Sequence, residues 1–128
     1  MGKHEIEEFA AALVANIRDA AVRSCDAILQ PNANSPVAAR WRKAAGVGGA
    51  VPPDVVIPDC VDEVVFHLLN AIDQGVIRLS FQSSTGTVVD LGEEGLGELA
   101  GWYMCSGGWR SRYSKERFVD DFADLAPN

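Results

Sequence analysis

Apolar residues recur at steps of three and four along residues 1–30. They are Ile6, Phe9, Leu13, Ile17, Ala21, Cys25 and Ile28. This spacing places side chains on one face of an α-helix, so the pattern predicts one long amphipathic helix from about residue 5 to residue 29. Such a helix would be about 35–40 Å long, which exceeds the width of a small domain. It therefore either wraps around the domain or places part of its apolar stripe against another subunit.

Prolines and glycines mark the boundaries of the next segments. Ser35 followed by Pro36 is typical of a helix start, with serine as the N-cap and proline at the first helical position. The pattern predicts a short helix over residues 37–45 that ends at Gly46. Residues 46–58 contain three glycines and three prolines. They indicate a long loop, which is typical of mobile or functional segments.

The helical period returns after this loop and then changes to a strand period. Asp59, with Asp62 three residues later, resembles a carboxylate form of the capping box and predicts a helix that ends before Gly75. Apolar and polar residues then alternate over residues 77–82, and residues 87–91 resume the pattern after a turn. Together these segments predict an antiparallel β-hairpin. Either helices cover its Ile77, Leu79 and Phe81 face, or the hairpin pairs with the sheet edge of another chain.

Two further helices complete the prediction for the chain. Residues 93–106 are expected to be helical, and Ser114 is expected to cap a last helix that buries Phe118, Phe122 and Leu125. We therefore predict a single α+β domain over residues 1–128, with about five helices packed around one antiparallel hairpin. Residues 59–126 form its helix–hairpin–helix–helix core.

The composition limits the classes of function. The 128-residue chain has a net charge of −7, which disfavours nucleic acids and anionic membrane surfaces as partners. No apolar run approaches the ~20 residues of a membrane helix. There is no apolar signal core, and the three cysteines form no C-x-x-C pair, so we expect a cytoplasmic protein with reduced thiols.

Short motifs that resemble catalytic or cofactor-binding signatures lack the context that their chemistry needs. Gly95–Ala100 matches G-x-G-x-x-A, but Glu93 and Glu94 precede it and no strand follows, so close helix packing is the better interpretation. Residues 120–124 match D-D-x-x-D in a chain too short for an isoprenoid-synthase bundle. A Cys105–His67 nucleophile–base pair stays open as an alternative to a structural cysteine. No zinc-ligand spacing is present, and we predict neither metal nor cofactor.

Two basic, tryptophan-bearing clusters contrast with the acidic remainder of the chain. Residues 40–43 carry three cations, and residues 109–117 carry four cations and one acid. Guanidinium groups clamp anions and indole rings stack on flat groups. The candidate ligand contacts are Trp41, Arg42, Trp109, Arg110 and Arg112. Alternatively, these cations pair with some of the 18 acidic residues, and the tryptophans fill gaps between helices.

These observations favour a non-catalytic protein-binding or homo-oligomerising domain, whose partner is a second copy, as in a homodimer, or another protein. The alternative is a small-molecule binding protein or small enzyme that holds an anionic or phosphorylated ligand in a Trp/Arg pocket. The two hypotheses differ in whether the basic clusters meet around a concave pocket. If they bind an anion, replacing Arg110 and Arg112 with alanine should weaken binding and leave the melting temperature nearly unchanged.

Overall fold

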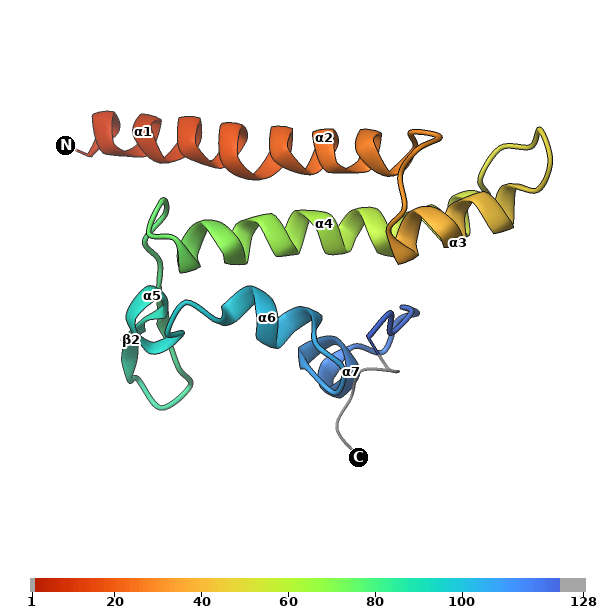
Figure 1. Cartoon of the computed structure of the whole chain (residues 1–128). Coiled ribbons are helices and arrows are strands. Elements are labelled where there is room, and N and C mark those ends of the chain that lie inside the picture. Colours follow the sequence, from red (N-terminus) through yellow and green to blue (C-terminus); the bar gives the residue numbers. More distant parts are fainter. Residues whose placement is uncertain (1, 123–128) are drawn as a thin grey trace.

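The computed structural model, which describes residues 2–122, is mainly helical and arranged in layers (Figure 1). One outer layer is a continuous helical rod made of α1 (Lys3–Leu13), the π-helical η1 (Val14–Arg18) and α2 (Asp19–Ile28). The middle layer holds α3 (Pro36–Ala45) and α4 (Pro53–Asp73). The other outer layer contains α5 (Leu91–Glu94), α6 (Leu99–Met104) and α7 (Trp109–Tyr113). With one antiparallel hairpin at the end of α4, the predicted α+β fold class is confirmed.

The predicted long N-terminal helix is confirmed, with a π turn at its centre. The sequence pattern explains this turn, because the apolar residues from Phe9 to Cys25 are spaced by four consecutive steps of four. In an α-helix each such step overshoots a full turn by about 40°. A wider π turn absorbs this drift. Ile17, within the π turn, is only 5% exposed and joins the core against α4.

The start of α3 agrees with its predicted cap. The Ser35 hydroxyl accepts a hydrogen bond from the Ala38 amide at 3.1 Å, and Pro36 occupies the first helical position. Gly46, which follows the helix, has a φ of 69°, a left-handed conformation that favours glycine. Local chemistry alone therefore sets both ends of this helix.

The predicted start of α4 is wrong, because the helix begins at Pro53 and not at Asp59. The glycine–proline loop is accordingly confined to residues 46–52, and Pro58 lies inside the helix. Pro53 suits the first helical position, because an N–H group there would have no helical carbonyl to bind. Asp59 is not an N-cap; it is 9% exposed and accepts hydrogen bonds from α3.

An interior proline deprives one backbone carbonyl of its helical partner. For Pro58 that carbonyl belongs to Asp54, four residues earlier. In this structure the Asp54 carbonyl oxygen accepts a hydrogen bond from the Arg117 Nε at 3.1 Å. A side chain from the C-terminal segment thus replaces the missing helical donor.

The main apolar cluster lies where η1, the end of α4 and the start of the hairpin meet. Ile17, Ala71 and Ile77 are its buried members, and Leu68 and Leu79 pack against them. The hairpin is confirmed with shorter strands, β1 (Ser80–Gln82) and β2 (Val88–Asp90), in which Phe81 pairs with Val89. Its apolar face is only partly covered, because Phe81 remains 57% exposed.

The helix predicted over residues 93–106 is broken. Its two parts, α5 and α6, are separated by Leu96 and Gly97, which have φ values of 55° and 73°. These left-handed residues end the first helix. The Asp73 carboxylate, at the end of α4, then accepts hydrogen bonds from the Leu99 and Ala100 amides at 2.9 and 3.0 Å. It caps the start of α6 from a different part of the chain.

The predicted last helix is also wrong within the described residues. Ser114 follows the end of α7 and does not begin a helix, because residues 114–122 are irregular. Phe118 is partly buried, Phe122 is 39% exposed, and Leu125 lies outside the described residues. Among the helices described, none has both the length and the apolar character needed to cross a membrane.

Candidate functional site

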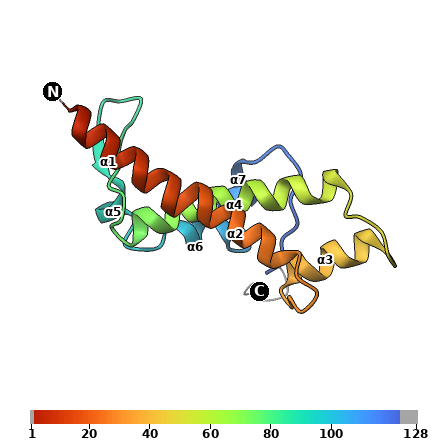
Figure 2. The ribbon, with the colours of Figure 1, turned by 90° about the horizontal axis from the view of Figure 1, so that it is seen from above.

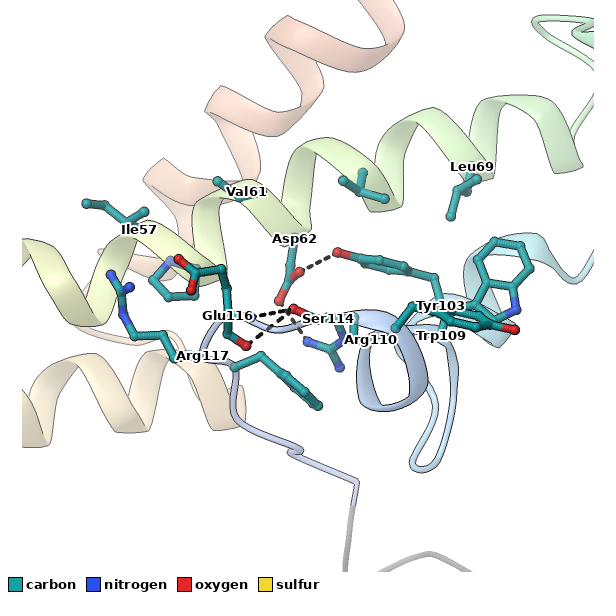
Figure 3. A pocket seen from close by; sticks show the side chains of 14 residues that line it. Ile57, Val61, Asp62, Leu69, Tyr103, Trp109, Arg110, Ser114, Glu116 and Arg117 are labelled. Carbon is teal, nitrogen blue, oxygen red and sulfur yellow. Dashed lines mark hydrogen bonds and ion pairs between the residues drawn. The ribbon is translucent and has the colours of Figure 1, made fainter. Parts of the chain in front are cut away.

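Two adjoining cavities lie along α4, on the side away from the N-terminal rod. The first has a volume of about 570 Å³ and opens between α4 and α7 with the segment that follows α7 (Figure 3). The second, of about 520 Å³, lies between α3, the start of α4 and residues 117–119. Pro58, Arg117 and Phe118 line both cavities. Both volumes fall in the range of small-molecule sites.

The walls of the first cavity are apolar. Residues at steps of four on α4 form one wall: Ile57, Val61, Val65 and Leu69. Trp109, Tyr113 and Phe118 line the opposite side. Such a ridge is an ordinary consequence of helical spacing, and in a closed core it would face another element. Here it is partly open, because Ile57 and Val61 are 53% and 55% exposed.

A buried ion pair lines the same cavity. Arg110 Nη1 donates to an Asp62 carboxylate oxygen at 2.7 Å, and the Tyr103 hydroxyl donates to the other oxygen at 2.6 Å (Figure 3). Arg110 Nη2 also donates to the Met104 carbonyl at 3.1 Å. The guanidinium carbon lies 4.9 Å from the centre of the Phe118 ring. Burial, followed by the hydrogen bond to Asp62, raises the pKa of the Tyr103 hydroxyl above its ordinary value.

Arg110 retains one unsatisfied donor. The residue is 7% exposed, and its Nε has no hydrogen-bond partner among the described residues. A buried N–H without an acceptor costs free energy, because it has lost its bond to water. An acceptor atom that entered the cavity and reached this group would recover that hydrogen bond.

A second polar network joins α3 to α4 beside the second cavity. Trp41 Nε1 donates to Asp59 at 2.7 Å, and Arg40 donates to Asp59 at 2.8 Å and to Asp121 at 2.6 Å. Burial lowers the pKa of Arg40, but the hydrogen bonds to Asp121 and Asp59 outweigh it, so that pKa is raised overall. Asp59 thereby holds the indole of Trp41, which is only 2% exposed.

The five candidate ligand residues do not gather at one point. Trp109 and Arg110 line the first cavity together. Trp41 is buried between α3 and α4, and Arg42 donates to the Ala33 carbonyl at 2.5 Å. Arg112 is exposed and lies over the ring of Tyr113, 5.1 Å from its centre.

The two basic clusters nevertheless share a cavity, through members that the sequence did not single out. Arg40 and Lys43 from the first cluster and Arg117 from the second line the second cavity. Sequence reasoning missed Arg117 because its position depends on the Asp54 carbonyl. The sequence signal for these buried ion pairs is the spacing of Asp59 and Asp62, which equally suits a helix cap and therefore does not distinguish the two roles.

A serine–histidine contact between α2 and α4 has some features of a catalytic pair. Ser24 Oγ lies 2.9 Å from His67 Nε2, which is within nucleophile–base distance. The Glu63 carboxylate approaches the same nitrogen at 3.7 Å, whereas a catalytic triad needs the acid on the other ring nitrogen. Burial is the main cause of the raised pKa of Glu63. The contact therefore links two helices without orienting a general base.

The remaining motif residues also take part in local contacts. His67 bonds to Ser24, whereas the Cys105 thiol donates to the Trp102 carbonyl at 3.8 Å. Of the D-D-x-x-D motif, Asp120 accepts from Ser106 at 2.9 Å and Asp121 binds Arg40, while residue 124 lies outside the described residues. Between residues 2 and 122, no three metal-ligating side chains are grouped to hold an ion.

Comparison with known proteins adds no relative to this description. No protein-family model matches the chain, and neither a curated protein nor a solved structure is significantly similar to it. The functional argument therefore depends on the surfaces, cavities and contacts of the molecule itself.

Proposed function

We propose that this protein is a non-catalytic homo-oligomerising domain and that a second copy covers the α1 arm, which is the part of the rod formed by Lys3–Leu13. The observation that carries the proposal is the exposure of α1. None of its eleven residues is buried, although Ile6, Phe9 and Leu13 lie on one helical face. Their exposed fractions are 65%, 44% and 37%. Figure 2 shows the rod lying over α4, with α1 extending toward α5 and the hairpin.

The total exposed surface supports an unfilled interface. The chain exposes 8927 Å², whereas a compact monomer of 13.7 kDa exposes about 6,600 Å². The seven residues outside the described range can account for at most about 1,100 Å² of the difference. The described part of the chain therefore exposes over about 1,000 Å² more surface than a compact monomer would. This excess is larger than the ~800 Å² of surface that each partner buries in a standard protein–protein interface.

A second copy suits the charge of the arm when the two arms are antiparallel. The first turns of α1 carry Glu5, Glu7 and Glu8. A two-fold axis perpendicular to the two helices places these acidic turns at opposite ends of the helix pair, so the apolar residues meet without contact between the like-charged turns. The same geometry makes the interface self-complementary.

The polar groups best suited to chemistry are engaged with one another, which supports a role without catalysis. Asp59 and Asp62 each bind two donors, and within residues 2–122 the acid nearest to His67, Glu63, approaches the same ring nitrogen as Ser24 and so does not orient the imidazole. General acid–base catalysis needs a group within reach of substrate and ready to exchange a proton.

The test is the oligomeric state in solution, measured by light scattering on a sizing column over a hundredfold range of concentration. We expect wild-type protein to elute above the monomer mass, and Ile6→Glu, alone or with Phe9→Glu, to shift it toward the monomer. Val47→Glu is the matched control, because Val47 is a fully exposed apolar residue in the 46–52 loop. A wild-type monomer at every concentration refutes the proposal, and oligomers that survive both α1 variants place the interface elsewhere.

Binding of a small anionic or phosphorylated ligand is the second candidate function. Two observations favour it: Arg110 Nε has no hydrogen-bond partner in the part of the chain that the structure describes, and Arg40, Lys43 and Arg117 line one cavity together. A probe such as inorganic pyrophosphate at a hundred times its dissociation constant should add about 2.7 kcal/mol of stability, a shift of several degrees. Lys43→Ala should reduce that shift, whereas Arg112→Ala should preserve it. Absence of any shift across phosphates and organic acids contradicts this function.

A further inference from the structure

Two thiols from different helices lie in contact on the face of α4 that meets the N-terminal rod. Cys25 of α2 and Cys60 of α4 place their sulfur atoms 3.3 Å apart, and both side chains are partly buried. They are 35 positions apart in the sequence, so the fold brings them together. Cys105, the third cysteine, is exposed next to the end of α6.

We propose that Cys25 and Cys60 form a reversible modification site, a dithiol that hydroperoxides oxidise to a disulfide joining α2 to α4. A disulfide needs the sulfur atoms about 2.05 Å apart, so they must approach by little more than 1 Å. The half-buried position leaves access for a molecule as small as hydrogen peroxide. This inference is independent of the α1 interface.

The oxidation is balanced with one peroxide for each pair of thiols. The Cys60 thiolate attacks one peroxide oxygen, the O–O bond breaks, and sulfenic acid and hydroxide form. The Cys25 sulfur then attacks the Cys60 sulfur, the S–S bond forms, and the sulfenic oxygen leaves with the Cys25 proton as water. The hydroxide from the first step takes up the proton that Cys60 released when it formed the thiolate, which gives a second water. The sulfur atoms lose two electrons in total, and the peroxide gains them.

The surroundings of the pair support this order of events. Burial, the hydrogen bond to Cys60 and the nearby Glu63 and Asp26 charges raise the pKa of Cys25 to about 12. Cys25 is therefore a neutral thiol at neutral pH and donates its hydrogen to the Cys60 sulfur. We therefore assign the acceptor, Cys60, as the thiol that starts the reaction and the donor, Cys25, as the thiol that resolves it.

The disulfide would close a loop that contains all of α3 and the 46–52 segment. It would fasten α2 to α4 next to Asp59, which holds Trp41 and Arg40. The α1 arm lies outside this loop. Oxidation is thus expected to stabilise the contact of α2 and α3 with α4 and to leave the arm unchanged.

The experiment uses the full chain with Cys105→Ser, so that only the two facing thiols react. After treatment with hydrogen peroxide, we expect an intact mass lower by two hydrogens, no alkylated cysteine, and full reversal by dithiothreitol. Because the bond closes a loop of about 35 residues, the melting temperature should rise by several degrees over the reduced form.

Single variants test the assigned roles. With Cys25→Ser, peroxide should leave a sulfenic acid on Cys60 that a dimedone probe traps; with Cys60→Ser, Cys25 should remain unlabelled. Two thiols that persist after peroxide overturn the proposal, and so does a disulfide that forms only between chains or only in denatured protein. Labelling of Cys25 but not Cys60 overturns the assigned order.

Discussion

Replacing Arg110 with alanine removes the cation from a buried ion pair and leaves its carboxylate partner in place. The side chains of Arg110 and Asp62 are 8% and 13% exposed, so water cannot readily solvate the remaining charge. The variant also loses the hydrogen bond to the Met104 carbonyl and the contact with the Phe118 ring. Arg112, two residues later, is exposed and provides a matched control.

The magnitude follows from the partners that remain. Breaking a buried ion pair costs about 3–5 kcal/mol, and the lower end applies because Tyr103 still donates to Asp62. The unfolding entropy of a chain of this length is about 0.27 kcal/mol per kelvin. A loss of about 3 kcal/mol therefore lowers the melting temperature by about 11 °C. Arg112→Ala should cost less than about 0.5 kcal/mol, or under about 2 °C.

Thermal and urea unfolding of both variants, followed by circular dichroism, measure this difference. The double variant Asp62→Ala/Arg110→Ala should lose less than the sum of the single losses, because it leaves neither charge unpaired. If Arg110→Ala is as stable as Arg112→Ala, the ion pair contributes nothing and the reasoning is wrong. The expectation from sequence that both replacements spare stability is retained only for Arg112.

Two further predictions concern a helix cap and the response to alkali. Ser35→Ala removes the cap of α3, so it should lower the free energy of unfolding by about 1 kcal/mol and the melting temperature by about 4 °C. The control variant Ser84→Ala, in the exposed hairpin turn, should leave the melting temperature almost unchanged. Equal losses in the two variants would contradict the role of the cap. The pKa of Cys25 is raised from 9.0 to about 12, so its contribution is complete below pH 9 and lost as pH rises toward 12. In urea unfolding at a series of pH values, Cys25→Ser should lose less stability over that range than wild type, and parallel pH profiles would contradict this.

Elements with a strong local signal could be predicted from the sequence. The N-terminal rod follows from a period sustained over more than twenty residues. The start of α3 follows from adjacent Ser35 and Pro36, and the hairpin from alternation around a turn. In each case the residues that decide the structure lie close together in the chain, so their pattern is visible without knowledge of the fold.

Elements decided by distant contacts could not be predicted. The sequence pattern predicts too late a start for α4, because prolines usually end helices. In the structure, the carbonyl of Asp54 that Pro58 leaves unpaired binds Arg117, which is 63 positions away from Asp54. The break before α6 depends on a left-handed Leu96, a rare conformation for a branched residue. It also depends on a cap from Asp73, 26 residues earlier than Leu99.

In the candidate site, too, local features could be predicted from the sequence and contacts between distant residues could not. The sequence located both basic clusters but could not determine which cations pair with which acids. Arg40 and Arg110 have carboxylate partners 19 and 48 positions away, whereas Arg42 and Arg112 remain exposed. Clusters of charge are visible in a sequence, but their assignment to ion pairs or open surface is a property of the fold.

The hydrogen bond between Arg117 and the Asp54 carbonyl also has an evolutionary consequence. Its acceptor is a main-chain atom, so any residue can occupy position 54 without removing it. Its contribution to stability depends instead on proline at position 58, because any other residue there would supply its own N–H to that carbonyl and Arg117 would no longer replace a missing donor. Among homologues we therefore expect positions 58 and 117 to change together, while position 54 varies independently of both.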